Sequence, residues 1–96
     1  MLVKQFMLAN LPAIQTIISV LPRPFDTHTF IRALSREFQT DYVCLLSQYS
    51  NDPFQTVNGQ IGRFLSDKQE ELSIVSQGKV LSANIFGENT ENEQWI

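Results

Sequence analysis

The amino-acid sequence predicts an α+β fold that is mostly helical, with a helical body followed by one β-hairpin. Two patterns carry this prediction. Apolar residues between positions 2 and 66 recur three and four apart, the spacing of helices buried on one side. From Leu72 to Phe86 the period becomes two, as in half-buried strands. With 96 residues and a hydrophobic fraction of 43%, the chain is predicted to form one domain, residues 1–96, around a modest core.

The charge balance argues against strong, sequence-independent binding of nucleic acid. The formal net charge is -3. Glu88, Glu91 and Glu93 place three negative charges in residues 88–96, which are predicted to form an acidic tail. Residues 1–87 hold seven Lys and Arg against seven Asp and Glu, so the body is close to neutral. Proteins that hold phosphates without sequence preference need a basic stripe, and none is visible here.

The single cysteine and the single histidine give no disulfide and no metal cluster. Cys44 has no partner for an internal disulfide, which favours a cytoplasmic protein, and it is expected to be a small buried hydrophobe. His28 has no set of metal ligands around it in the sequence and is expected to be incidental. The sequence therefore predicts no cofactor and no metal.

Residues 1–21 form the predicted N-terminal helical segment, with a break near Asn10 and Pro12. Pro is favoured in the first turn of a helix and Asn just before it, as a cap. Polar residues interrupt the segment before it reaches the roughly 18 to 20 apolar residues of a membrane span, so no membrane association is expected. Its second half carries a broad apolar stripe that predicts either core or an interface to a second copy: Leu11, Ile14, Ile17, Ile18 and Leu21.

Residues 25–66 are predicted to form a core of three helices. The first begins after Asp26, a cap residue, and Phe25 just before it can pack on Phe30 as a hydrophobic staple. A short second helix is expected from Thr40 or Asp41 to about residue 49.

The third helix of this core is expected from Pro53 to Leu65 or a little beyond, with Asp52 as its cap. One side of it is an apolar stripe made of Phe54, Val57, Ile61, Phe64 and Leu65. The opposite side carries polar residues and two glycines: Gln55, Thr56, Gly59, Arg63 and Ser66, with Asn58 and Gly62 at its margins. Two glycines toward the outer side let a large partner approach the helix backbone, and this partner is either a duplex or another protein.

Residues 72–86 are predicted to form the hairpin, with its turn at Gln77-Gly78. This register pairs Val75 with Val80 and leaves them as a small exposed apolar spot near the tip. In the tail that follows, Trp95 is expected to be an anchor packed on the body.

Enzyme signatures are largely absent from the sequence. It contains no GxSxG, P-loop, GxGxxG or HExxH pattern. Gly59 and Gly62 lie inside an amphipathic helix rather than in a strand-to-helix turn, and Glu70-Glu71 is typical of a solvated surface. We therefore expect a protein that is not an enzyme.

The order of three helices and a hairpin, from about Asp26 to Phe86, resembles the winged-helix (helix-turn-helix) superfamily in architecture. The resemblance implies that the third helix enters the major groove of DNA and that the hairpin is a wing on the adjacent backbone. The residues it implies as nucleic-acid contacts are Gln55, Thr56, Asn58, Gly59, Gln60, Arg63 and Lys79. The stretches FQTVNGQIGRFL and LSIVSQGKVLSANIFG and the terminal Trp are also similar to small uncharacterised bacterial proteins, which implies no activity.

Two hypotheses of function follow. In the first, the protein is a winged-helix regulator that binds double-stranded DNA, as a homodimer through its N-terminal helix. In the second, the same fold is a protein-interaction module without nucleic-acid binding, docking its partner on the glycine-bearing helix face or on the Val75–Val80 spot. The acidic tail would then screen that helix. The two hypotheses differ in whether other basic residues gather around Arg63 and Lys79 in three dimensions.

Overall fold

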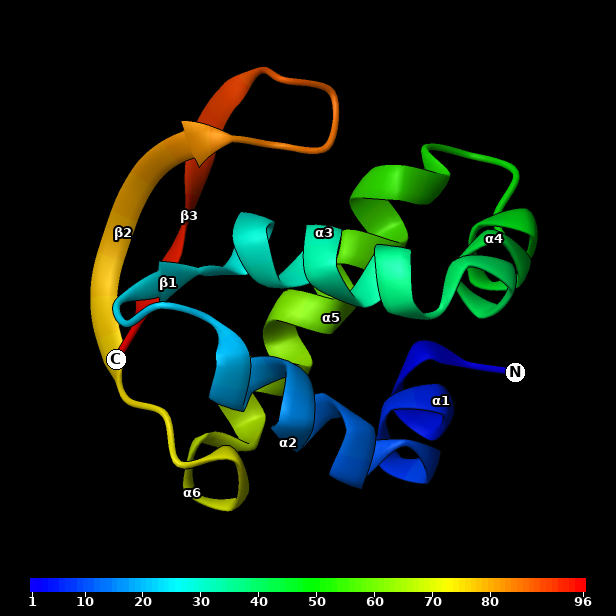
Figure 1. Ribbon diagram of the computed structural model, residues 1–96. Helices are drawn as coiled ribbons and strands as arrows, with labels where there is room; N and C mark the ends of the chain where they lie inside the picture. The colour runs from blue at the N-terminus through cyan, green and yellow to red at the C-terminus, as the bar shows by residue number, and fades with distance from the viewer.

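The computed structural model describes residues 1–96, and it confirms the α+β, mostly helical class. Six helices and three strands follow one another along the chain (Figure 1). They are α1 (Val3–Ala9), α2 (Leu11–Val20), β1 (Phe25–Asp26), α3 (Thr27–Glu37), α4 (Gln39–Ser47), α5 (Pro53–Asp67), α6 (Gln69–Leu72), β2 (Ser76–Ala83) and β3 (Asn89–Trp95).

The three strands form one antiparallel sheet in the order β1-β3-β2, so the C-terminal strand lies in the middle. Figure 1 shows this sheet on one side of the molecule, with β2 curving past the start of α3 and with α5 running behind α3. The helices and the sheet share one core of 19 buried hydrophobic residues. Trp95 is 1% exposed in this core, which confirms its prediction as an anchor.

The N-terminal segment breaks where the sequence predicts, but Asn10 does not cap α2. Its side-chain amide instead donates to the carbonyl of Phe6 at 2.9 Å, so it closes the end of α1. The central residues of the apolar stripe of α2 are buried in the core of the same chain, Ile14 and Ile18 among them. The stripe is therefore core. A homodimer through this segment stays a prediction, and it would have to use apolar side chains that remain exposed there, such as Leu8 and Val20.

The predicted start of α3 is confirmed, while the predicted cap of α5 is wrong. The Asp26 carboxylate accepts the backbone N–H of Thr29 at 2.8 Å, as an N-cap does. Asp52 has a φ of 48° and its side chain makes no capping hydrogen bond, so its backbone turns the chain into α5 instead. Pro53 occupies the first turn, where its missing N–H costs nothing.

The predicted hairpin at residues 72–86 is wrong in its turn and in its strands. β2 runs without a break through Gln77 and Gly78, and its partner is β3, the segment predicted to be an acidic tail. Ser76 pairs with Trp95 and Lys79 with Glu93, so one extra residue of β2 forms a β-bulge, in which Gly78 has a φ of +94°. A Gly inside a strand suits a bulge as well as a turn, and the pairing partner downstream selects the bulge.

The true turn of the hairpin is at residues 84–88. The side-chain oxygen of Asn84 accepts the backbone N–H groups of Phe86 and Glu88, at 2.9 and 3.0 Å. Gly87 has a φ of +82°, a conformation that favours glycine. These contacts satisfy the backbone N–H groups of the loop, whose residues Asn84 to Gly87 also indicate from the sequence that the chain turns there.

The Val75–Val80 pair does not exist in this register. The backbone of Val75 exchanges hydrogen bonds with Ile96, at 2.8 and 3.0 Å, and Val80 lies opposite Asn92. Leu72, predicted to be in a strand, ends α6. The docking spot proposed for the two valines is therefore lost.

Cys44 is exposed on α4 rather than buried, which corrects the prediction of a small core residue. None of the helices combines the length and the apolar character that crossing a lipid bilayer requires.

Candidate functional site

A cleft with a volume of about 780 Å³ lies between α5 and the β2–β3 hairpin. The exposed side of α5 forms one wall, and β3 with the hairpin loop forms the other. The start of α3 and Trp95 also contribute to its lining. The cleft contains residues of the glycine-bearing helix face that the sequence singles out, among them Gln55, Gly59 and Arg63.

The two glycines of α5 differ in what surrounds them. A Cβ atom on Gly62 would lie 3.4 Å from Cγ2 of Thr27, so the close packing of α5 against α3 accounts for this glycine. A Cβ atom on Gly59 would have no neighbour within 4 Å. Gly59 also lies within α5, where its conformation is helical. Neither packing nor conformation within this chain therefore requires a glycine at position 59.

The charges that line the cleft are mostly negative. Four carboxylates line the cleft, those of Asp52, Glu88, Glu91 and Glu93. Only two basic side chains, Arg63 and Lys79, stand against them. Lys79 lies 4.0 Å from Glu93, and Arg63 lies 3.9 Å from Asp67 one turn along α5. Both basic groups thus already have an acidic neighbour.

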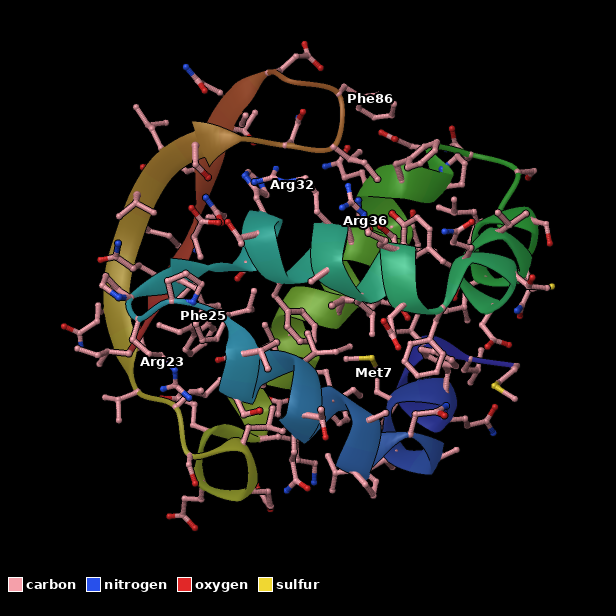
Figure 2. All side chains as sticks on the ribbon, in the orientation of Figure 1. Met7, Arg23, Phe25, Arg32, Arg36 and Phe86 are labelled. Carbon is pink, nitrogen blue, oxygen red and sulfur yellow. The ribbon has the colours of Figure 1, made fainter.

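One end of the cleft is bridged by two aromatic rings. The ring of Phe86 in the hairpin loop lies edge-on to that of Phe54, with centroids 4.8 Å apart. Figure 2 shows Phe86 reaching from the loop toward the first turn of α5. Phe86 is still 61% exposed, so the bridge offers an apolar surface to solvent.

A polar network holds the hairpin against the start of α3. Asn92 of β3 is 7% exposed, and its side-chain oxygen accepts the backbone N–H of His28 at 2.9 Å. Its amide nitrogen donates to the hydroxyl of Ser82 at 3.0 Å. Because buried polar groups are costly when unpaired, this network fixes the position of the hairpin wall.

The side chains of His28 and Ser82 lie within hydrogen-bond distance, as a catalytic nucleophile and its base do. Here they are part of the polar network that holds the hairpin against α3. Nδ1 of His28 lies 3.1 Å from the Ser82 hydroxyl and 3.2 Å from the Ser82 carbonyl. A carbonyl only accepts, so the contact with the Ser82 carbonyl is a hydrogen bond in the tautomer that carries the proton on Nδ1. In that tautomer Nδ1 has no free lone pair to accept the proton of the Ser82 hydroxyl.

The Asp26 carboxyl is part of the same network. Burial raises its pKa, but the hydrogen bond from the Thr29 backbone, those from the Ser82 and Thr29 hydroxyls and the charge of His28 outweigh burial. The pKa of Asp26 therefore lies below its ordinary value of 3.8. This carboxylate acts as a helix cap and as an acceptor within the network.

The structure brings five of the seven predicted contact residues into the cleft lining, namely Gln55, Asn58, Gly59, Arg63 and Lys79. Thr56 and Gln60 are outside it, and the amide of Gln60 donates to the Tyr49 hydroxyl at 3.4 Å. The side-chain oxygen of Asn58 is already taken, because it accepts the hydroxyl of Tyr42 at 2.6 Å. Burial raises the pKa of that hydroxyl.

The remaining basic residues do not join Arg63 and Lys79 in lining the cleft. Arg32 donates to the carbonyl of Ala83 at 2.7 Å, and the guanidinium of Arg23 lies 5.5 Å from the ring centre of Phe25. Figure 2 shows Arg32 and Arg36 on one side of α3 and Arg23 on the other. The basic patch that would favour DNA does not form around the cleft.

Sequence reasoning missed the residues of the opposite wall. Glu91, Asn92 and His28 line the cleft, and the contacts that hold His28 against Asn92 and Ser82 join segments more than 50 positions apart. The two buried residues of β3, Asn92 and Trp95, are three positions apart, so the strand shows no period-two alternation that sequence reasoning could have used.

No protein-family model matches the sequence, and no curated protein or solved structure matches the chain.

Proposed function

We propose that this protein is a binding module without enzymatic activity, and that it binds a segment of a protein partner in the cleft between α5 and the β2–β3 hairpin. The observation that carries the proposal is Gly59, an open patch of helix backbone facing a wall of carboxylates. A glycine inside a helix costs about 0.5–1 kcal/mol relative to alanine. A partner that approaches the backbone closely explains why an alanine is absent there.

The charge of the cleft favours a polypeptide over a nucleic acid. Phosphate binding depends on cations that displace counterions. Here Glu88, Glu91 and Glu93 stand opposite the helix face that would enter a groove, together with Arg63 and Lys79. Like charges placed against a partner are costly, and a duplex would bring its phosphates to this wall.

Binding of double-stranded DNA by a winged-helix-like fold is the competing proposal. It is favoured by the gathering of Gln55, Arg63 and Lys79 in one cleft, since such side chains can contact base edges and phosphates. It requires the carboxylates of the hairpin to move or to be neutralised. For this reason we rank it second.

We place the module in the cytoplasm. Its one cysteine, Cys44, is free and exposed. A reducing compartment keeps such a thiol from forming disulfides between molecules.

The test uses the whole chain with a photo-crosslinking amino acid at Gln55 or, as a matched control, at Thr40. Both positions are exposed, but Thr40 lies on α4, outside the cleft. In an extract of the cells that make the protein, we expect a crosslinked partner at Gln55 and not at Thr40. The substitution Gly59→Leu should abolish that crosslink while Gly59→Ala weakens it less.

Fluorescence anisotropy of a labelled random duplex, at low salt and at about 0.15 M salt, tests the competing proposal. Salt-dependent binding that Arg63→Ala and Lys79→Ala both weaken would contradict our ranking and favour DNA. A Gln55 crosslink that survives Gly59→Leu would contradict the cleft as the binding site.

A further inference from the structure

We infer that the partner segment in the cleft is positively charged, with lysine or arginine side chains directed at the hairpin wall. This inference rests on the proposed function and goes further, because it names the chemistry of the partner. Three features of the cleft support it: carboxylates without an ion pair, an open glycine and an exposed aromatic ring.

The first feature is the state of Glu88 and Glu91. Both line the cleft and both are exposed, and neither carboxylate forms a salt bridge or accepts a side-chain hydrogen bond within the chain. Glu93, in contrast, accepts the Ser76 hydroxyl and lies beside Lys79. Two carboxylates on one wall are therefore uncompensated, and a cationic partner would be electrostatically complementary to them.

The second feature is the open helix backbone at Gly59 on the opposite wall, which a partner can approach closely. The open space at Gly59 gives a partner backbone access to the axis of α5 without displacing any side chain. A segment that lies there runs between the helix and the carboxylates of β3, because both walls line the same cleft. Its long side chains are then within reach of Glu91.

The third feature is the exposed ring at the end of the cleft. Phe86 is 61% exposed although its edge packs on Phe54. Lysine and arginine have aliphatic stems that cover apolar surface, and their charged ends are attracted to aromatic rings. An acidic wall beside an exposed ring therefore matches a basic side chain better than it matches a phosphate or a purely apolar residue.

The experiment titrates the whole ¹⁵N-labelled chain with a defined probe, a peptide of alternating lysine and serine of about eight residues, which spans roughly 25 Å when extended. We expect shifts of the backbone amides of Gly59 and Glu91. A peptide of the same length with glutamate in place of lysine should give none. The affinity is measured in parallel by anisotropy of the labelled peptide at about 0.15 M salt.

Matched variants separate a binding site from general charge attraction. Glu88→Gln with Glu91→Gln should weaken binding of the lysine peptide about fivefold. Glu70→Gln with Glu71→Gln changes the net charge equally, but on α6 and away from the cleft, so it should weaken binding less than about twofold. Gly59→Leu should weaken binding about tenfold by filling the cleft, and its unfolding curve shows whether it remains folded.

Equal losses in the two glutamate pairs, or amide shifts that miss Gly59 and Glu91, would overturn the inference. A Gln55 crosslink that depends on Gly59, together with no binding of the lysine peptide, would retain the proposed function and reject a cationic partner. If neither the Gln55 crosslink nor binding of the lysine peptide is found, the proposed function and the cationic partner are both rejected. Tighter binding of a duplex than of the peptide would replace both with the DNA proposal.

Discussion

The indole N–H of Trp95 donates to the hydroxyl of Thr27 at 3.0 Å, joining the end of the sheet to the first residue of α3. Both residues are buried. The Thr27 hydroxyl also donates to the carbonyl of Glu93, and its methyl group faces Gly62 of α5. One threonine thus sets how β3, α3 and α5 meet, and the cleft lies between those elements.

Replacing Thr27 by Val should destabilise the protein by about 1–3 kcal/mol, because it keeps the shape but leaves the buried indole N–H without an acceptor. The free energy of unfolding from urea titrations measures the effect. Thr40→Val at an exposed position of α4 is the control and should change stability by less than about 0.5 kcal/mol. Equal effects at the two positions would show that the Trp95–Thr27 hydrogen bond contributes nothing.

Asp26→Asn should remove part of the acid sensitivity of the fold. The carboxylate has a lowered pKa in the folded state, so the stability it contributes is fully present above its unfolded pKa, near 3.8, and is lost as the pH falls through the folded value. Urea unfolding between about pH 7 and pH 2 should show the two proteins differing most at neutral pH and converging in acid. A difference that stays constant with pH would assign the effect to capping geometry alone.

The helices were largely predictable because their signals are local. The cap at Asp26, the break at Asn10 and the apolar stripe from Phe54 to Leu65 each depend on neighbours within a few positions. The sheet was not predictable in the same way. Gln77-Gly78 has the residue types of a turn, and only pairing with β3 makes it a bulge. The strand NTENEQW also has only one β-branched residue, Thr90, and one aromatic residue, Trp95, among five Asn, Gln and Glu residues, which are uncommon in strands.

The two glycines of α5 should respond differently to alanine. Gly59→Ala should stabilise the free protein by about 0.5–1 kcal/mol, because the new Cβ meets nothing and alanine favours the helix. Gly62→Ala should gain less or lose stability, since its Cβ would lie 3.4 Å from Thr27. Thermal or urea unfolding of the two variants tests this. A destabilising Gly59→Ala would show that position 59 needs glycine for the fold rather than for a partner.

One of the two walls of the candidate cleft could be predicted from the sequence. Its α5 wall follows from helical spacing, which grouped Gln55, Gly59 and Arg63 on one face. Its other wall depends on a sheet whose middle strand is the last element of the chain. For that reason residues 88–96 were predicted to be an acidic tail anchored by Trp95 rather than a strand, although Glu91 and Glu93 line the same cleft as α5.

Neutralising the hairpin wall should reveal how much the carboxylates oppose nucleic acid. Deleting residues 88–96 would remove β3 from the centre of the sheet, so it cannot test this point. Glu88→Gln with Glu91→Gln keeps the strand, and neither carboxylate has a partner to lose. Random-duplex anisotropy at low salt should then show salt-dependent binding stronger than that of the parent chain, because two repulsive charges beside Arg63 and Lys79 are gone.

Glu70→Gln with Glu71→Gln is the control, because it makes the same change in net charge on α6. A gain confined to the hairpin pair would show that screening is local to the cleft, whereas equal gains would attribute it to net charge. No gain in either pair would mean that the cleft has no phosphate-binding capacity for the carboxylates to mask.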